Sequence, residues 1–517
     1  MIKNYLFSLL GIVVVLLSSC SENDDTLVSP DPEPDPVVEN ENDFVLVDLD
    51  GNRYFPFLRT DKTLHYQFTD KVDLSRLVPF APEKTDSVLW GDNKLPFDGK
   101  SYDFSDFTRN IFFITRNDFG GDDSLKVVIH DLPVLIIATP DSLPIDSKTE
   151  RKEGCLVKLV TNNEELNLGT AGIKGRGNST WVEPKKPYNI KLDKKAEILG
   201  MKKSKHWILL ANAKYDRTQL HNATAFEIAR LTDYPWIPSG RYVELVLNGE
   251  HKGLYYLCEK IRIEKGKIDI EMDEDKDDVT NCAYLLESIV KTGENNPVEL
   301  NLNQFDTGII HATGHDPVWC TFGWEICEPD DNIVSEQSDY IRESLTNVEK
   351  LISDDIDSGK YRDFFDIETA IDWWFTEELC INEEASRTKN VYLYKKGKEG
   401  KIYLGPIWDL DAWSFGTAGL RTFWAKDYAL YYRYLFRDPV FVNRVKEKWA
   451  EYRPIWEEKI PKFIDDQYRL IYKSAKRNEL MWPDWIVPAD SYEQSVELMK
   501  DAFMQQLKWM DEQIQNM

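Results

Sequence analysis

Short acidic segments in the C-terminal third of the chain carry the residues best suited to chemistry. Residues 382–384 read Asn-Glu-Glu, residues 390–394 have the pattern of a hairpin strand, and residues 405–411 end in a turn with Asp409 and Asp411. Carboxylates are hard oxygen ligands for Mg²⁺ or Mn²⁺. Phosphoryl transfer uses such a cation together with a carboxylate that orients the acceptor hydroxyl. The order of these segments therefore suits metal-assisted phosphoryl transfer.

The acidic residues divide into candidate metal ligands and one candidate catalytic group. If the strand around Asp409 and Asp411 stays extended, both carboxylates point to one side and can hold one or two cations. Asn382 adds a neutral oxygen ligand, and Glu384 orients or deprotonates the acceptor from a loop at a helix end. The structural alternative for the two aspartates is a turn at a strand end, capped by side-chain hydrogen bonds.

Basic residues upstream are candidates for contact with phosphates. Arg176 lies in a Gly-Arg-Gly-Asn loop, Lys186 precedes a proline, and Lys191 lies in the strand expected at residues 188–192. Alternate residues of that strand share an apolar face, so Lys191 lies on the other face and need not be solvated. Glu259 is a candidate ion-pair partner that holds one of the lysines in place. The structural alternatives are a simple turn for the loop and solvated surface lysines.

Helices and a hairpin must position these groups. Apolar residues at three- and four-residue steps predict a helix over residues 367–381, which anchors the loop of Glu384. Asp216 and Gln219 have capping-box spacing and predict a helix from there to Leu231. The Asn-Gly pair within residues 242–259 predicts a two-residue hairpin turn between strands.

The first residues of the chain have the pattern of a secretory signal. Lys3 precedes an apolar run over residues 9–17, which leads to Leu-Ser-Ser and then Cys20. The run is short for a membrane helix, which is the less favoured alternative. Residues 1–20 resemble a bacterial lipobox, which implies that Cys20 is lipidated and becomes the mature N-terminus. The acidic residues 21–25 resemble the tag that sends some Bacteroidetes lipoproteins to the cell surface.

The rest of the chain divides by composition and periodicity. Residues 21–42 are rich in proline and carboxylates and predict an extended, self-repelling tether. Residues 43–130 contain short alternating segments between turns, which predict a small β-sandwich. Residues 131–517 form the main domain, which opens on a strand buried on both faces at 132–137. It includes a helical C-terminal part at 425–517, so the expected fold class is α+β.

The net charge of the chain excludes some classes of partner. The 517 residues carry a formal net charge of −27, whereas nucleic acids and anionic membranes require basic patches. We therefore expect no nucleic-acid partner, and the acidic surface reads as a solubility feature.

The spacing of the cysteines does not indicate a zinc site. Cys320 and Cys327 are close enough in sequence for a disulfide in an exported protein.

Several ordered motifs resemble the spore coat protein H (CotH) kinase family. The resemblance runs from about residue 132 to the C-terminus. The residues that carry it are Lys174-Gly175-Arg176-Gly177-Asn178-Ser179-Thr180-Trp181 with Lys185-Lys186-Pro187-Tyr188, then residues 207–212, the hairpin at 242–255, and Gly405-Pro406-Ile407-Trp408-Asp409-Leu410-Asp411.

The resemblance implies an atypical protein-kinase-like domain that binds ATP with Mg²⁺ or Mn²⁺ and phosphorylates Ser or Thr of protein partners. By position, Asp409 matches the metal-binding aspartate of the family, and Asp411 and Asn382 join it as candidate ligands. Glu384 falls at the catalytic acid, which is commonly aspartate in the family. Arg176, Asn178, Lys186, Lys191 and Glu259 are the candidate cofactor-binding residues.

Two classes of function stay open at this point. The first is an exported lipoprotein kinase, tethered to the outer membrane through Cys20 and facing the periplasm or the cell surface. The second is a catalytically inactive binding, adhesion or assembly protein on the same fold, because ATP is scarce outside the cytoplasm and Glu384 departs from the family pattern. Glycan binding is a third reading that depends only on the many tryptophans, which core packing explains.

Overall fold

The computed structural model describes most of the chain after the predicted tether. The described residues are 44–60, 62–68, 72–80, 85–90, 93–96, 99–106, 111–116, 122–162, 164–212, 214–270, 278–290, 301–309, 322–329, 333–397, 400–416, 419–486 and 489–517. The predicted signal segment, Cys20, the tether and Cys320 lie outside these residues, so lipidation and the disulfide stay predictions. None of the helices in the described ranges has the length and apolar character to cross a bilayer.

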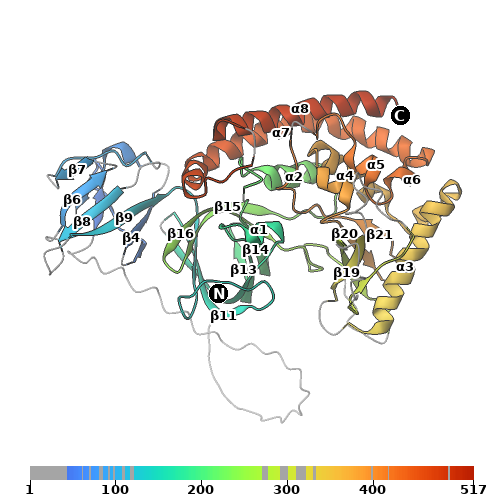
Figure 1. Ribbon diagram of the computed structural model, residues 1–517, viewed down its shortest axis with the longest axis horizontal. Coiled ribbons are helices and arrows are strands. Elements are labelled where there is room, and N and C mark those ends of the chain that lie inside the picture. Colours follow the sequence, from blue (N-terminus) through green and yellow to red (C-terminus); the bar gives the residue numbers. More distant parts are fainter. Residues whose placement is uncertain are drawn as a thin grey trace, which may run out of the picture.

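Two sheets form the N-terminal module, drawn in blue in Figure 1. A three-stranded sheet has the order β2-β1-β5, and a six-stranded sheet has the order β3-β4-β9-β8-β6-β7. Phe44, Tyr66 and Phe113 belong to one buried core that both sheets share, as the β-sandwich expectation requires. The strands are β1 (Val45–Val47), β2 (Arg53–Tyr54), β3 (Leu58–Arg59), β4 (Thr63–Gln67), β5 (Val78–Phe80), β6 (Thr85–Trp90), β7 (Asn93–Pro96), β8 (Ile111–Arg116) and β9 (Asp122–His130), with a 3₁₀ turn at Leu74–Arg76.

A closed barrel follows, with the strand order β10-β11-β12-β13-β14-β16-β15. β10 closes it by pairing parallel with β15. The apolar run at 132–137 supplies β10, whose inward residues are buried as expected. Asn248 and Gly249 have φ of 52° and 77°, which confirms the two-residue turn between β15 and β16. The strands are β10 (Val134–Ala138), β11 (Lys152–Thr161), β12 (Glu164–Gly175), β13 (Tyr188–Ile198), β14 (Met201–Leu210), β15 (Gly240–Leu247) and β16 (Glu250–Glu259).

A second sheet and a set of helices complete the fold. The sheet has the order β18-β19-β17-β20-β21, with β17 (Ala283–Val290), β18 (Gln304–Phe305), β19 (Phe322–Glu328), β20 (Tyr392–Lys396) and β21 (Ile402–Leu404). The helices are α1 (Ser179–Val182), α2 (His221–Arg230), α3 (Ser335–Asp354), α4 (Ile367–Leu379), α5 (Trp424–Tyr428), α6 (Tyr432–Leu435), α7 (Pro439–Met481) and α8 (Tyr492–Gln515). Short 3₁₀ turns occupy Ile356–Ser358, Lys360–Asp363 and Glu383–Arg387.

The C-terminal helices tie the parts together. In Figure 1, α7 and α8 run side by side across the molecule, and α7 packs on α2 and on β16 of the barrel. Phe441, Val445 and Trp449 of α7 are buried, at the four-residue steps of one helix face. Helices and strands are thus mixed throughout the main domain, which confirms the α+β class.

The helix predicted from Asp216 begins later than expected. α2 starts at His221, because the Asp216 carboxylate accepts hydrogen bonds from Thr218 Oγ1 at 2.6 Å and from the His221 amide at 3.0 Å. Gln219 has a φ of 63°, which a helix cannot contain. Residues 216–220 therefore form a turn that caps the helix from outside.

Candidate active site

The segment that carries Asp409 and Asp411 is a loop and not the extended strand that we expected. β21 ends at Leu404, and Asp409 has a φ of 62°, in the left-handed region. A residue other than glycine pays about 1–2 kcal/mol for this conformation, and such strain concentrates at functional sites. The charge of Asp409 still acts on the carboxyl of Asp411. The relation between the two side chains is therefore set by a left-handed turn and not by strand alternation.

Arg176 is the cation of this site. It directly follows β12, and its Nη2 lies 3.6 Å from Oδ2 of Asp409. Its guanidinium also stacks over the Trp408 ring, 5.4 Å from the centroid. Burial opposes its charged form, but the carboxylates of Asp409 and Asp411 outweigh burial and raise the Arg176 pKa. The structure thus brings the predicted loop arginine to the predicted metal ligands across more than 200 residues of sequence.

Asp411 is a buried carboxyl among other carboxylates. Only 6% of the residue is exposed. Burial raises its pKa well above the usual range, and the charges of Asp409, Asp216 and Glu384 raise it further, against the opposing charge of Arg176. A divalent cation would offset this accumulation of negative charge. The donor set at Asp409 and Asp411 therefore fits Mg²⁺ or Mn²⁺.

The N-terminal end of α2 holds the backbone of the Asp411 loop. His221 Nδ1 lies 3.1 Å from the Asp411 carbonyl oxygen, and its Nε2 lies 3.6 Å from Asp216 Oδ1. The Asn222 side chain accepts a hydrogen bond of 2.8 Å from the Leu410 amide. The loop is therefore fixed by side chains of a helix that is distant in sequence.

Glu384 lies on a turn that begins where α4 ends. The Asn382 side chain accepts a hydrogen bond of 3.0 Å from the Glu384 amide and donates one of 2.6 Å to Glu377 Oε2. Burial raises the pKa of Glu377 to about 8, and the charge of Glu384 adds to this effect. Lys389 Nζ lies 2.9 Å from Glu384 Oε1. Asn382 thus acts as a cap for this turn, and its predicted role as a metal ligand stays a prediction.

The other predicted phosphate contacts lie elsewhere. Lys186 donates a hydrogen bond of 2.6 Å to the Trp181 carbonyl oxygen and sits over the ring of that residue. Lys191 is exposed on β13, because the face of a barrel strand opposite the core meets solvent, which agrees with the alternative of a solvated surface lysine. Asn178 is exposed and accepts a hydrogen bond of 3.0 Å from Lys148 Nζ. In the described part of the chain, none of these residues pairs with the aspartates.

Glu259 is buried at the end of β16 but does not hold either predicted lysine. Its Oε2 accepts a hydrogen bond of 3.0 Å from the Ser239 amide. Burial raises its pKa, and the main opposing charge is that of Lys267. Glu259 therefore lies in a separate polar cluster at the end of the barrel.

Sequence reasoning missed several residues that the structure places in or near the site. Asp216 and His221 were expected only as parts of a helix start, and Lys389 was not singled out. Lys185, and not Lys186, is the buried lysine, with its Nζ donating a hydrogen bond of 2.7 Å to the Ala211 carbonyl oxygen. Burial lowers the pKa of Lys185 well below its usual range. Both lysines precede β13, so strand alternation could not tell which one turns inward.

A cavity of about 240 Å³ opens beside the Asp411 loop. Its lining includes Arg217, His221, Glu383 and Trp413. Trp413 exposes 55% of its surface, which is unusual for a large aromatic side chain within a fold. Its lining contains His221 but not Asp409, Asp411 or Glu384, so the cavity borders the loop without reaching the predicted metal ligands.

The sequence of the chain matches one family of known proteins. No curated protein matches the chain. A family model described as CotH kinase protein matches residues 173–510, which include Arg176, Glu384, Asp409 and Asp411. The match covers well over half of the chain, and the family points to kinase-like function. The chain therefore belongs to the CotH kinase protein family.

Proposed function

We propose that this protein binds ATP with Mg²⁺ or Mn²⁺ and transfers phosphate to Ser or Thr of protein partners. The observation that carries the proposal is that Arg176 Nη2 lies 3.6 Å from Asp409 Oδ2, on the loop of the buried Asp411. The turn that carries Glu384 is tied to the same loop by a hydrogen bond of 3.0 Å from the Glu383 amide to the Trp413 carbonyl oxygen. Positioning and charge stabilisation supply most of the catalysis in phosphoryl transfer. The proposal includes a protein-kinase-like fold for the main domain.

Each residue has a distinct part in this proposal. Asp409 and Asp411 would hold the divalent cation, and the cation would neutralise negative charge on the phosphates of ATP. Arg176 adds a fixed positive charge beside them, 3.6 Å from Asp409. Glu384 accepts the proton of the acceptor hydroxyl, whose oxygen forms a bond to the γ-phosphorus while the bond to the bridging oxygen of ADP breaks.

The location of the protein is part of the proposal. A lipid on Cys20 and an acidic tether would place the folded part of the chain at the outer membrane, facing the periplasm or the cell surface. The partner is then an exported or surface protein with an accessible hydroxyl side chain. The formal charge of −27 favours acceptors with basic flanking residues, because opposite charge speeds their encounter with this surface.

One observation favours a second candidate, a binding protein without catalysis. Lys389 Nζ lies 2.9 Å from Glu384 Oε1, so an ion pair already engages the carboxylate that would have to receive the proton of the acceptor hydroxyl. In this alternative the family fold displays surfaces for adhesion or assembly, and the carboxylates are structural.

The test is incorporation of labelled phosphate from γ-labelled ATP, with Mn²⁺ or Mg²⁺, into the protein itself and into basic protein acceptors. We expect labelling by the wild type, none by Asp409→Ala and at least a 100-fold lower rate for Glu384→Gln. Asp466→Asn is the matched control, because Asp466 is an exposed residue of α7 whose ion-pair partner among the described residues is the neighbouring Arg469, at 3.2 Å. Wild-type protein that binds ATP but labels nothing would favour the binding-protein alternative.

A further inference from the structure

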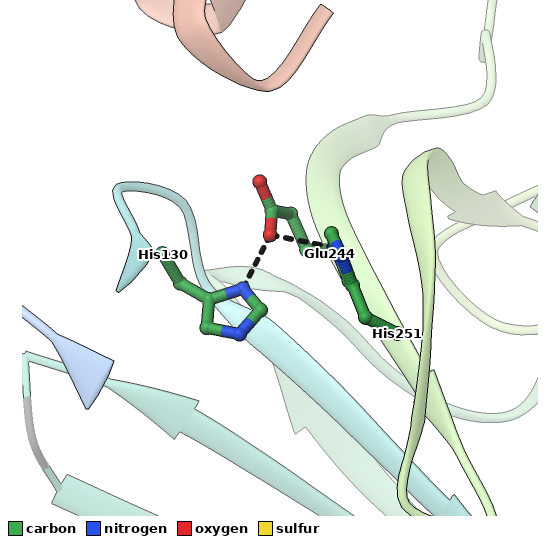
Figure 2. A group of neighbouring side chains, drawn as sticks. All are labelled: His130, Glu244 and His251. Carbon is green, nitrogen blue, oxygen red and sulfur yellow. Dashed lines mark hydrogen bonds and ion pairs between the residues drawn. The ribbon is translucent and has the colours of Figure 1, made fainter. Parts of the chain in front are cut away.

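A second cluster of potential metal ligands lies where the N-terminal module meets the barrel. His130 is the last residue of β9, Glu244 lies in β15 and His251 lies near the start of β16. Figure 2 shows both rings turning a nitrogen towards the same oxygen of Glu244. His251 Nε2 lies 2.9 Å from Glu244 Oε2, and His130 Nδ1 contacts that oxygen as well. The three ligand atoms all lie within 4.8 Å of one another.

This set of donors matches a zinc site. Zinc takes imidazole nitrogen at about 2.0–2.1 Å and carboxylate oxygen at about 2.0–2.2 Å, in tetrahedral geometry. Ligand atoms around such an ion lie roughly 3.3 Å apart, so the Glu244 oxygen and the two ring nitrogens that now contact it have to move apart to admit the ion. Three protein ligands leave the fourth position for water. The cluster shares no residue with the candidate active site.

The three ligands lie inside the protein at this junction. The side chains of His130 and Glu244 are almost fully buried, and that of His251 is only 8% exposed. A buried carboxylate is stable only when it is paired with other charges or coordinates a metal.

His251 Nε2 is also a buried polar atom without a satisfactory partner. Although it lies 2.9 Å from Glu244 Oε2, the two atoms do not meet the geometry of a hydrogen bond. A buried polar atom left in this way costs about 1–3 kcal/mol. Coordination of a metal ion would satisfy it.

Other residues orient the ligands from outside, as partners of metal ligands usually do. His130 Nε2 lies 3.0 Å from His65 Nδ1, so the ring is held through both nitrogens. The Ser474 hydroxyl of α7 donates to Glu244 Oε1. Arg477 Nη1 lies 3.1 Å from Glu244 Oε2, and its charge weakens the attraction for a cation.

The carboxyl of Asp131 lies on the other side of the same hydroxyl. Its Oδ1 is 2.8 Å from Ser474 Oγ. Because a hydroxyl has one proton, Ser474 donates to only one of the two carboxyl groups at a time.

We propose that His130, Glu244 and His251 bind a zinc ion that joins the N-terminal module to the barrel. The ion would connect the end of β9 to the β15–β16 hairpin and would add to the apolar contacts of that junction, where Phe57 and Leu58 pack on Val134 and Val246. Its role is structural and is independent of phosphoryl transfer.

The test is the zinc content of protein purified without a polyhistidine tag or chelator, incubated with zinc and desalted, measured by inductively coupled plasma mass spectrometry. We expect about one zinc per chain in the wild type and at least a tenfold loss in His251→Gln. His251→Cys supplies a thiolate ligand and keeps the zinc, and with Co²⁺ it shows a thiolate charge-transfer band. His206→Gln is the control, because His206 is a histidine of the same barrel whose pKa burial lowers to about 3; it keeps the zinc.

A measurement on the wild type avoids any folding defect of the variants. Removal of zinc with a chelator should lower the thermal unfolding midpoint, and one equivalent of zinc should restore it. Wild-type protein that retains no zinc after desalting, or a His251→Gln variant that retains as much as the wild type, would overturn the proposal. An unfolding midpoint that does not respond to the chelator would also contradict it.

Discussion

Arg176 and Asp409 meet at 3.6 Å, between the end of barrel strand β12 and the loop that follows β21. This contact joins the two sheets of the main domain at the candidate active site. Arg176 also opposes the negative charge around Asp411. The same side chain therefore links the stability of the site to the electrostatics that phosphate transfer needs.

Substitution of Arg176 tests that link. In Arg176→Met we expect phosphate transfer to fall at least tenfold and the free energy of unfolding to fall by about 1–3 kcal/mol, because the carboxylates lose their compensating charge. Arg176→Lys keeps the charge but loses the planar stack on Trp408, so its activity should be intermediate. Activity assays with urea unfolding check both effects, and a fully active Arg176→Met would show that the arginine is dispensable.

Asn382 should position Glu384 and not bind the nucleotide. Its side chain caps the Glu384 amide at 3.0 Å, and a displacement of about 1 Å at a catalytic group can cost 100-fold in rate. We expect Asn382→Ala to lower the rate 10- to 100-fold with unchanged ATP affinity, whereas Asn382→Asp, which keeps the acceptor oxygen, should recover part of it. Weaker ATP binding by Asn382→Ala would contradict this positioning role. It would support the role of metal ligand that the sequence pattern suggested.

Glu377 should make stability depend on pH. The unfolded chain loses the proton of this residue near the usual pKa of 4.5, whereas the folded protein keeps it to about pH 8. Between these values the unfolded state binds fewer protons, so this residue lowers stability as pH rises. Relative to Glu377→Gln, the wild type should be similar in stability at pH 4.5 and less stable at pH 8. Urea unfolding of both proteins at both pH values measures this difference in free energy of unfolding. A difference between wild type and variant that is the same at pH 4.5 and at pH 8 would contradict the prediction.

Lipidation should depend on Cys20. We expect Cys20→Ser to lose the lipid and to leave the membrane fraction when the full chain is expressed in a bacterial host that makes lipoproteins. Metabolic labelling with a fatty acid and fractionation measure the two effects. Normal membrane retention of the variant would mean that another part of the chain holds the protein there.

Local patterns in the sequence predicted much of the fold. The hairpin of β15 and β16, helix α4 and the long C-terminal helices all have strong periodicity or turn chemistry, and the structure contains them. Where polar side chains compete for the backbone, the prediction failed. Asp216 and Gln219 hold a turn and delay the start of α2, although their spacing is that of a helix cap.

The candidate site was predictable in composition but not in geometry. Asp409, Asp411 and Glu384 were chosen from residue type and order, yet their approach depends on a left-handed residue at Asp409 that alternation cannot reveal. Asp216 and His221 come from a helix far away in sequence and became visible only in three dimensions. His130, Glu244 and His251 carry no recognisable spacing, because the end of β9 in the N-terminal module meets the β15–β16 hairpin of the barrel more than 100 residues later in the sequence.

The most direct test of the proposed function is the affinity of the protein for ATP in the presence of Mn²⁺, measured by isothermal titration calorimetry. We expect one site in the wild type, at least a tenfold weaker affinity in Asp409→Asn, and wild-type affinity in the Asp466→Asn control. Equal affinity of Asp409→Asn and the wild type, or no binding of ATP by the wild type, would contradict the assignment of these carboxylates to a nucleotide-bound metal ion.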